Sequence, residues 1–230
     1  MPKSTLNILC LLCVLFKLIA QDKSENFNFE TFLFTDFPEA RRYAIEDLTE
    51  NKKTNDALGL LRSYSNLSEI CFYQKENDSS LMYANKALVY AHKYNKKLEQ
   101  AKLYNRIGSL KNREGNYNDA LIKFENALEI TESTHIYNIQ SEIINNIALL
   151  YRIRGDEENA VRELEKSIKI SQNYNNQNAL ACSYNILGLL HYNTKKERSI
   201  YYYKEAIKLT KKLKNNYLYG IVLSNLGDLY

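Results

Sequence analysis

The sequence predicts an all-α protein built as a solenoid of antiparallel helical hairpins, and three observations support this prediction. The 230 residues include only 7 glycines and 2 prolines, and both prolines fall within the first 38 residues, so the rest of the chain lacks the strongest helix breaker. A four-residue pattern with helical spacing recurs about every 40 residues. A second helical pattern, of small and bulky side chains, follows each copy.

The first element is an N-terminal segment, residues 1–20, that has the three zones of a secretory signal peptide. Lys3 precedes an apolar run, Leu6 to Phe16, and the small residue Ala20 stands before a polar stretch. We expect cleavage between Ala20 and Gln21 and export to the periplasm or the medium. The alternative is an uncleaved N-terminal anchor, although the apolar run is shorter than the roughly 20 residues that span a bilayer.

The cysteines and the net charge exclude two other classes of function. Cys10 and Cys13 have dithiol spacing but lie inside the apolar run, so we assign them no redox or metal role. Cys71 and Cys182 fall in distant repeats and are expected to be buried, unbridged thiols. Without residues 1–20 the chain has 29 basic and 27 acidic side chains, a balance that gives no electrostatic case for nucleic acid.

Two elements are expected between the signal segment and the repeats. Residues 21–37 form a leader outside the repeat register, and its part from Asn26 to Phe37 contains five phenylalanines that could pack over the first hairpin or dock on a partner. Residues 38–56 should form a degenerate capping helix, because Pro38 suits a first helical turn and Ala40 and Ala44 have the spacing of the second pattern.

The first helix of each predicted hairpin carries four recurring positions at spacings of 3, 4 and 7, which lie on one helical stripe. The third position is always small, and a small side chain lets another helix approach closely. The five sets are Tyr64, Leu67, Ser68 and Cys71; Tyr104, Ile107, Gly108 and Lys111; Ile144, Ile147, Ala148 and Tyr151; Tyr184, Leu187, Gly188 and His191; and Leu223, Leu226, Gly227 and Tyr230.

The second helix of each hairpin carries its own stripe, spaced 4 and then 3. These sets are Ser80, Ala84 and Ala87; Ala120, Phe124 and Ala127; Ala160, Leu164 and Ser167; and Ser199, Tyr203 and Ala206. Between the helices, Gly115 and Gly155 can take the left-handed conformation that ends one helix, and Asn118 or Asp156 can cap the next. A single hairpin cannot bury its apolar face, so copies must stack.

The repeat region therefore covers residues 57–230, with four hairpins that start near residues 61, 101, 141 and 181 and a half repeat from residue 220. These residues resemble a tetratricopeptide repeat. The residues that carry the resemblance are Tyr104, Ile107, Gly108, Gly115, Tyr117, Ala120, Phe124 and Ala127, and in a later copy Tyr184, Leu187, Gly188, Tyr203 and Ala206.

This sequence departs from the family pattern in three ways. Lys111 and Cys71 replace a first-helix tyrosine, no proline closes a repeat, and the period is 40 residues instead of 34. Such long-period repeats are similar to those of bacterial regulators that bind peptides, and with the signal segment the chain resembles an exported bacterial type. The resemblance implies a right-handed superhelix whose first helices line a concave face that holds the ligand.

Counting from the aromatic position, the resemblance places a set of polar side chains on that concave face. The predicted peptide-binding residues are Lys102, Asn105, Asn112, Arg113, Asn145, Arg152, Asn185, Tyr192 and Asn193. Asn105, Asn145 and Asn185 recur at one repeat position, and an amide can donate to and accept from a peptide backbone. We therefore expect that replacing all three by alanine abolishes partner capture and leaves helical content intact.

The predicted function is an interaction scaffold that binds a peptide or protein segment in the concave groove, with no cofactor or metal, no nucleic acid, and no membrane contact beyond the signal segment. The alternative is the sensory N-terminal part of a bacterial signalling receptor, a histidine kinase or transcriptional regulator, that continues beyond Tyr230. We do not expect an enzyme, because His92, His135 and His191 lie in different repeats and the sequence contains no HExxH, GxSxG or glycine-rich phosphate loop.

Overall fold

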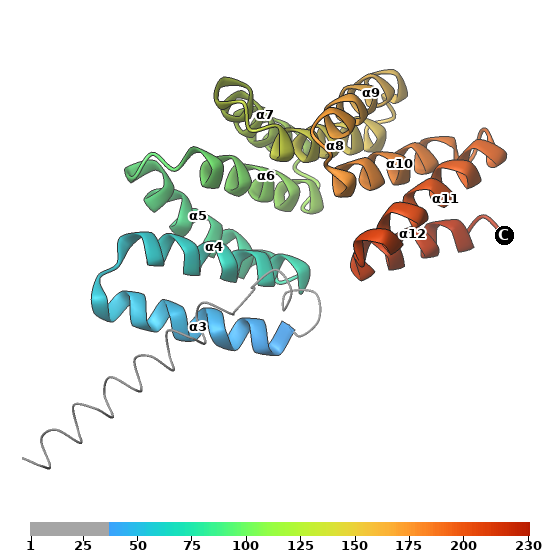
Figure 1. The fold of residues 1–230 in the computed structure, drawn as a ribbon. Coiled ribbons are helices and arrows are strands. Elements are labelled where there is room, and N and C mark those ends of the chain that lie inside the picture. The colour runs from blue at the N-terminus through green and yellow to red at the C-terminus, as the bar shows by residue number, and fades with distance from the viewer. Residues whose placement is uncertain (1–36) are drawn as a thin grey trace, which may run out of the picture. The chain divides into compact units, whose positions relative to one another are not determined.

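The computed structural model describes residues 37–230, and every regular element in this range is an α-helix (Figure 1). The prediction of an all-α solenoid is thereby confirmed for the described residues. The signal segment, Cys10, Cys13 and nearly all of the leader lie outside them. The chain divides into two units, Met1–Ala40 and Arg41–Tyr230, and the contacts described below lie within the second.

The helices follow one another with short turns. They are α3 (Phe37–Thr54), α4 (Ala57–Tyr73), α5 (Asn77–Lys93), α6 (Lys97–Arg113), α7 (Tyr117–Thr134), α8 (Tyr137–Ile153), α9 (Glu157–Asn173), α10 (Gln177–His191), α11 (Lys196–Leu213) and α12 (Asn216–Gly227). Within residues 37–230, no helix combines the length and the apolar character that a membrane span requires.

Consecutive helices pair into four hairpins, α4 with α5, α6 with α7, α8 with α9, and α10 with α11, and each hairpin packs on the next. The first helices also contact one another in the order α4, α6, α8, α10 and α12, so they form a continuous row. We call this the inner row. The second helices α5, α7, α9 and α11 cover its other side (Figure 1).

The turns contain the residues that the sequence indicated, with one exception. Gly115 and Gly155 have φ angles of 80° and 79°, the left-handed conformation that ends a helix. Asp156 caps α9 by accepting a hydrogen bond from Asn159 N at 3.2 Å. The prediction for Asn118 was wrong: α7 begins at Tyr117, so Asn118 lies inside the helix, where its side chain accepts from Arg154.

Inside each hairpin, the size of the second-helix residue matches the small residue of the first helix. In the first hairpin the second-helix stripe has the small, buried Ala84 at its centre, and Ser68 and Ser80 exchange hydroxyl-to-carbonyl hydrogen bonds of 3.0 and 2.8 Å. In the next hairpin the buried Phe124 ring lies against Gly108, where a Cβ atom would meet it at 2.6 Å. Tyr203 lies against Gly188 in the same way, at 2.4 Å. The glycines are therefore required by the rings that cover them.

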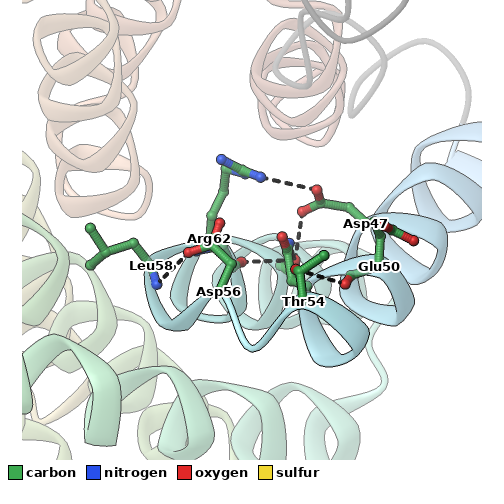
Figure 2. Close-up of polar contacts among 9 residues, drawn as sticks. Asp47, Glu50, Thr54, Asp56, Leu58 and Arg62 are labelled. Atoms are coloured by element: carbon green, nitrogen blue, oxygen red, sulfur yellow. Dashed lines mark hydrogen bonds and ion pairs between the residues drawn. The ribbon is translucent and has the colours of Figure 1, made fainter. Parts of the chain in front are cut away.

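Helix α3 is held on the first hairpin by a polar cluster, which Figure 2 shows at the junction with α4. Asp47 accepts from Arg62 Nη2 at 3.0 Å and from the Ser63 hydroxyl at 2.5 Å, and Asn51 donates to the same hydroxyl at 2.9 Å. Asp56 caps α4 by accepting from the backbone N–H groups of Leu58 and Gly59 (Figure 2). These bonds fix the first turn of the solenoid.

Candidate functional site

The inner row presents a stripe of side chains that stay partly exposed after the repeats have packed. The stripe follows from helical periodicity, because one face of each first helix packs on its own hairpin and the flanks contact the neighbouring repeats. We call it the inner face. It consists of Glu69, Tyr73, Lys102, Arg106, Ser109, Glu142, Asn146, Leu149, Cys182 and Leu189.

The inner row curves strongly enough to bring its two ends together. The rings of Tyr73, at the end of α4, and Tyr217, at the start of α12, lie 5.2 Å apart between centroids in an edge-to-face arrangement of 79°. Such a distance is a direct aromatic contact. Residues of the first and the last helix of the inner row are therefore in direct contact.

An ion pair crosses the inner face between the first two repeats. Arg106 lies 3.0 Å from Glu69 and also donates to the backbone oxygen of Ser65 at 3.1 Å. Its side chain is 12% exposed, so the guanidinium is well shielded from water. Burial, with a smaller contribution from the negative charge of Glu69, raises the pKa of the Tyr73 hydroxyl well above its usual range. This part of the face is a low-dielectric environment.

Cys182 lies on the inner face beside Glu142, which corrects the expectation that it is a buried core thiol. Its side chain is half exposed, yet the surrounding protein and then the charge of Glu142 raise its pKa to about 12. Cys182 packs against the hydrophobic cluster that contains Tyr203 and Val222, which accounts for this desolvation. Cys71, by contrast, is buried as expected, and its sulfur accepts from Arg41 Nη2 at 3.2 Å.

Asn145 was predicted to bind a peptide, but both ends of its side-chain amide bond to other residues of the protein. Its assignment to a ligand site is therefore corrected. Asn145 is 3% exposed. Its amide donates to Ala179 O at 2.8 Å, and its oxygen accepts from the Ser183 hydroxyl at 2.7 Å. Both partners belong to the next repeat. Asn145 therefore joins the third and fourth hairpins.

Asn105 and Asn185 also bond to the next repeat along the chain. Asn105 accepts from Asn146 at 2.8 Å, and Asn185, which is buried, accepts from Asn225 at 2.9 Å. In each case the donor stands one position further along the repeat. Arg106 occupies that same position in its own repeat and likewise donates to the preceding one, at Ser65 O. The recurring asparagines thus form connections between repeats.

Three further predicted residues lie on or beside α6. Lys102 is half exposed and pairs with Glu99 at 3.5 Å. Arg113 lies 3.7 Å above the Phe72 ring centroid and donates to Phe72 O at 2.8 Å, and burial lowers its pKa. Asn112 is half exposed, and its amide oxygen is buried without a hydrogen-bond partner. Lys102 is the member of this group that lies on the inner face.

The structure brings the last three predicted residues together. Arg152, Tyr192 and Asn193 line one cavity of about 250 Å³, with Leu189, Tyr203, Asn225 and Asp228 as the other lining residues. The first helices α8, α10 and α12 contribute to it, and Tyr203 reaches it from the second helix α11. Four residues of this cavity were absent from the predicted set.

The sequence-based reasoning missed Glu69, Tyr73, Arg106 and Asn146 on the inner face. Asn146 and Arg106 had a detectable signal, because both stand one position after the recurring asparagine position. Glu69 and Tyr73 also had one, because Glu69 stands at the repeat position of Ser109 and Leu149, and Tyr73 at that of Arg113 and Asn193. The charged members of the predicted set, Lys102, Arg113 and Arg152, are all basic. Glu69 and Glu142 make the observed face mixed in charge. Among residues 37–230, no group of His, Cys, Asp and Glu side chains could hold a metal ion.

Comparison with known proteins finds similarity in the repeat region. A family model described as "Tetratricopeptide repeat" matches residues 99–173 and 137–212. Photosystem I assembly protein Ycf3 of Synechococcus sp. (strain CC9605) is 30% identical over 79 residues, which cover 34% of this chain and 44% of that protein. The match therefore spans less than half the length of that relative.

Several solved structures share the fold. BtubC (BKLC) from P. vanneervenii is 18% identical with a TM-score of 0.61, and the match covers 84% of this chain and 85% of that one. A Rap protein complexed with Competence and Sporulation Factor is 15% identical with a TM-score of 0.64, covering 87% and 61%. NprR in complex with its cognate peptide NprX is 19% identical with a TM-score of 0.60, covering 98% and 74%. At these identities the likeness concerns the fold.

Proposed function

We propose that this protein, which carries tetratricopeptide repeats over residues 99–212, is an interaction scaffold that binds an extended peptide segment of a partner protein against its inner face. The observation that supports this most directly is the stripe of partly buried polar and apolar side chains along the inner row, whose two ends meet where Tyr73 contacts Tyr217. An extended peptide presents backbone donors and acceptors along its length, and the half-exposed polar side chains of successive first helices can meet them.

Two neighbours in fold agree with this proposal. The solved Rap protein is complexed with Competence and Sporulation Factor, and the NprR structure contains its cognate peptide NprX. A solenoid of this kind therefore can hold a peptide. For this chain we propose Lys102, Ser109 and Leu149 as contact residues, because they are half exposed on consecutive first helices. The pairing of Glu69 with Arg106 favours a peptide of mixed charge over a strongly acidic one.

Filling the inner face should abolish peptide binding. Ser109 bonds only to Asn105 O of its own helix, so Ser109→Trp adds bulk to the space without removing a contact between repeats. The test is selection of a phage-displayed random peptide library, followed by measurement of Kd for the enriched peptides. We expect wild-type protein to enrich peptides and Ser109→Trp to bind them at least about 100-fold more weakly, because the bulky ring excludes the chain.

The matched control is Val89→Trp, since Val89 is 65% exposed on the second helix α5. This variant should bind the selected peptides as wild type does, and both variants should keep wild-type circular dichroism. Equal binding by Ser109→Trp and wild type would show that peptides bind elsewhere. Enrichment of no peptide by the wild-type protein would count against the proposed function itself.

We also propose that the chain is exported and cleaved between Ala20 and Gln21, as the zones of residues 1–20 indicate. Expression of the full chain in a bacterial host should give a periplasmic product. Its intact mass should equal that of a chain that starts at Gln21. Ala20→Arg should block cleavage, because signal peptidase sites require a small residue at this place. A wild-type product that keeps residues 1–20 would support the anchored alternative.

A further inference from the structure

The cavity lined by Arg152, Tyr203 and Asp228 has the size of a small-metabolite site. Its volume is about 250 Å³. A single water accounts for about 30 Å³, and sites for drug-sized ligands have roughly 300–1,000 Å³. The cavity is therefore too large for one bound water and too small for a folded peptide segment.

Tyr203 lines this cavity and carries a hydroxyl that has no hydrogen-bond partner among residues 37–230. The residue is fully buried, and its oxygen has no partner in the described part of the chain. The nearby Ser199 hydroxyl donates to Gly188 O at 2.7 Å. Burial raises the pKa of the Tyr203 hydroxyl, and the weaker influence of Ser199 does not offset it. A buried hydroxyl without a partner is unfavourable unless something else in the cavity bonds to it.

Packing does not explain why this residue is a tyrosine. The equivalent position holds Ala84, Phe124 and Leu164 in the other hairpins, and none of these side chains has a polar atom. Phe124 shows that a phenyl ring fills the place against a glycine without a hydroxyl. The hydroxyl of Tyr203 is thus an addition specific to the hairpin that borders the cavity.

Two opposite charges line the same cavity without neutralising each other. Arg152 Nε is buried and has no hydrogen-bond partner. The carboxylate of Asp228 also lines the cavity, and no ion pair joins these two described residues. An anionic ligand alone would be repelled by Asp228, and a cationic ligand alone by Arg152. A molecule that carries both charges a short distance apart satisfies both residues.

We propose that this cavity binds a free α-amino acid, with the ligand carboxylate on Arg152 and the Tyr203 hydroxyl and the ligand ammonium on Asp228. The backbone of an internal peptide residue has neither charge, and a peptide terminus has one of them, so a carboxylate and an ammonium on the same carbon select the free amino acid. Asn193 and Asn225 add amide groups at the cavity wall. The cavity shares Leu189 with the inner face, but its charged residues lie outside that face and the proposal does not rest on peptide binding.

The test uses isothermal titration calorimetry and thermal shift of the purified full chain with each of the common amino acids. We expect at least one to bind and to raise the melting temperature. Its N-acetyl and carboxamide derivatives, which each lack one charge, should bind at least about tenfold more weakly. Tyr203→Phe should weaken binding of the amino acid to a similar extent, since a hydrogen bond to a charged group is lost.

The Tyr203→Phe variant is expected to fold, because Phe124 occupies the equivalent position in the second hairpin. Circular dichroism checks this. The matched control is Tyr202→Phe. Tyr202 does not line the cavity, and its ring centroid lies 6.1 Å from that of Tyr184. This variant should bind the amino acid as wild type does. The proposal is overturned if no amino acid binds at millimolar concentration, if both derivatives bind as well as the parent, or if Tyr203→Phe retains full affinity. Selection of peptides with the Tyr203→Phe variant tests peptide binding at the inner face independently of amino-acid binding.

Discussion

Phe124→Ala is expected to lower the free energy of unfolding by about 3–5 kcal/mol, the usual cost of truncating a buried aromatic ring. Phe124 is 1% exposed and lies in a cluster with Ala120, Ala127, Ile143 and Ile147, so it fills both its own hairpin and the junction with α8. The surrounding helices cannot collapse fully onto alanine, because each is held by a neighbouring repeat. Urea unfolding followed by far-UV circular dichroism measures the loss.

A double-mutant cycle with Gly108 tests the cause. In wild-type protein, Gly108→Ala should cost about 1–3 kcal/mol, because its Cβ would lie 2.6 Å from the Phe124 ring. In the Phe124→Ala background that clash disappears. The double variant would then have alanine at both positions, and the first hairpin already has two small residues there, Ser68 and Ala84. The double variant should therefore be more stable than the sum of the two losses by more than about 0.5 kcal/mol. Additive losses would contradict direct packing of the ring on Gly108.

The matched sizes explain how much of the fold could be predicted from the sequence. Both stripes were visible, because they repeat at helical spacing and about every 40 residues. The relation between the two stripes of one hairpin was not used in the prediction. Glycine occurs in the first helix where the second helix has a large ring, as in Gly108 with Phe124 and Gly188 with Tyr203. The larger Ser68 occurs where the second helix has Ala84. Compensation of this kind appears only when the two stripes are compared copy by copy. Helix type and order depend on local pattern, and these were predictable.

The candidate site was less predictable, for a physical reason. A polar residue on a first helix can face a ligand or the next repeat, and a difference of one position decides which. Asn145 and Asn146 are adjacent, yet the first is buried between repeats and the second is half exposed on the inner face. Contacts between distant repeats, such as Tyr73 with Tyr217, depend on a curvature that adds up over four hairpins. Neither property is present in a single repeat.

Asn145→Ala is expected to lower the free energy of unfolding by about 2 kcal/mol, because two hydrogen bonds between the third and fourth hairpins are lost at about 1 kcal/mol each. These are the bonds to Ala179 O and from the Ser183 hydroxyl. Asn105→Ala is the matched control. It occupies the same repeat position but loses one bond, from the half-exposed Asn146, and should cost about 0.5–1 kcal/mol.

The order of these two losses distinguishes a structural asparagine from a ligand-binding one. Exposed binding residues are usually neutral to stability, so a clamp residue replaced by alanine would leave the unfolding midpoint within about 0.5 kcal/mol of wild type. If Asn145→Ala leaves stability unchanged but weakens peptide binding, Asn145 does not join the repeats. The original prediction that it binds the peptide would then be supported. If stability falls as expected, the triple replacement of Asn105, Asn145 and Asn185 loosens the junctions between repeats. Loss of binding in that variant would then follow from loss of the inner face itself, because a groove built from stacked hairpins lasts only as long as the stack.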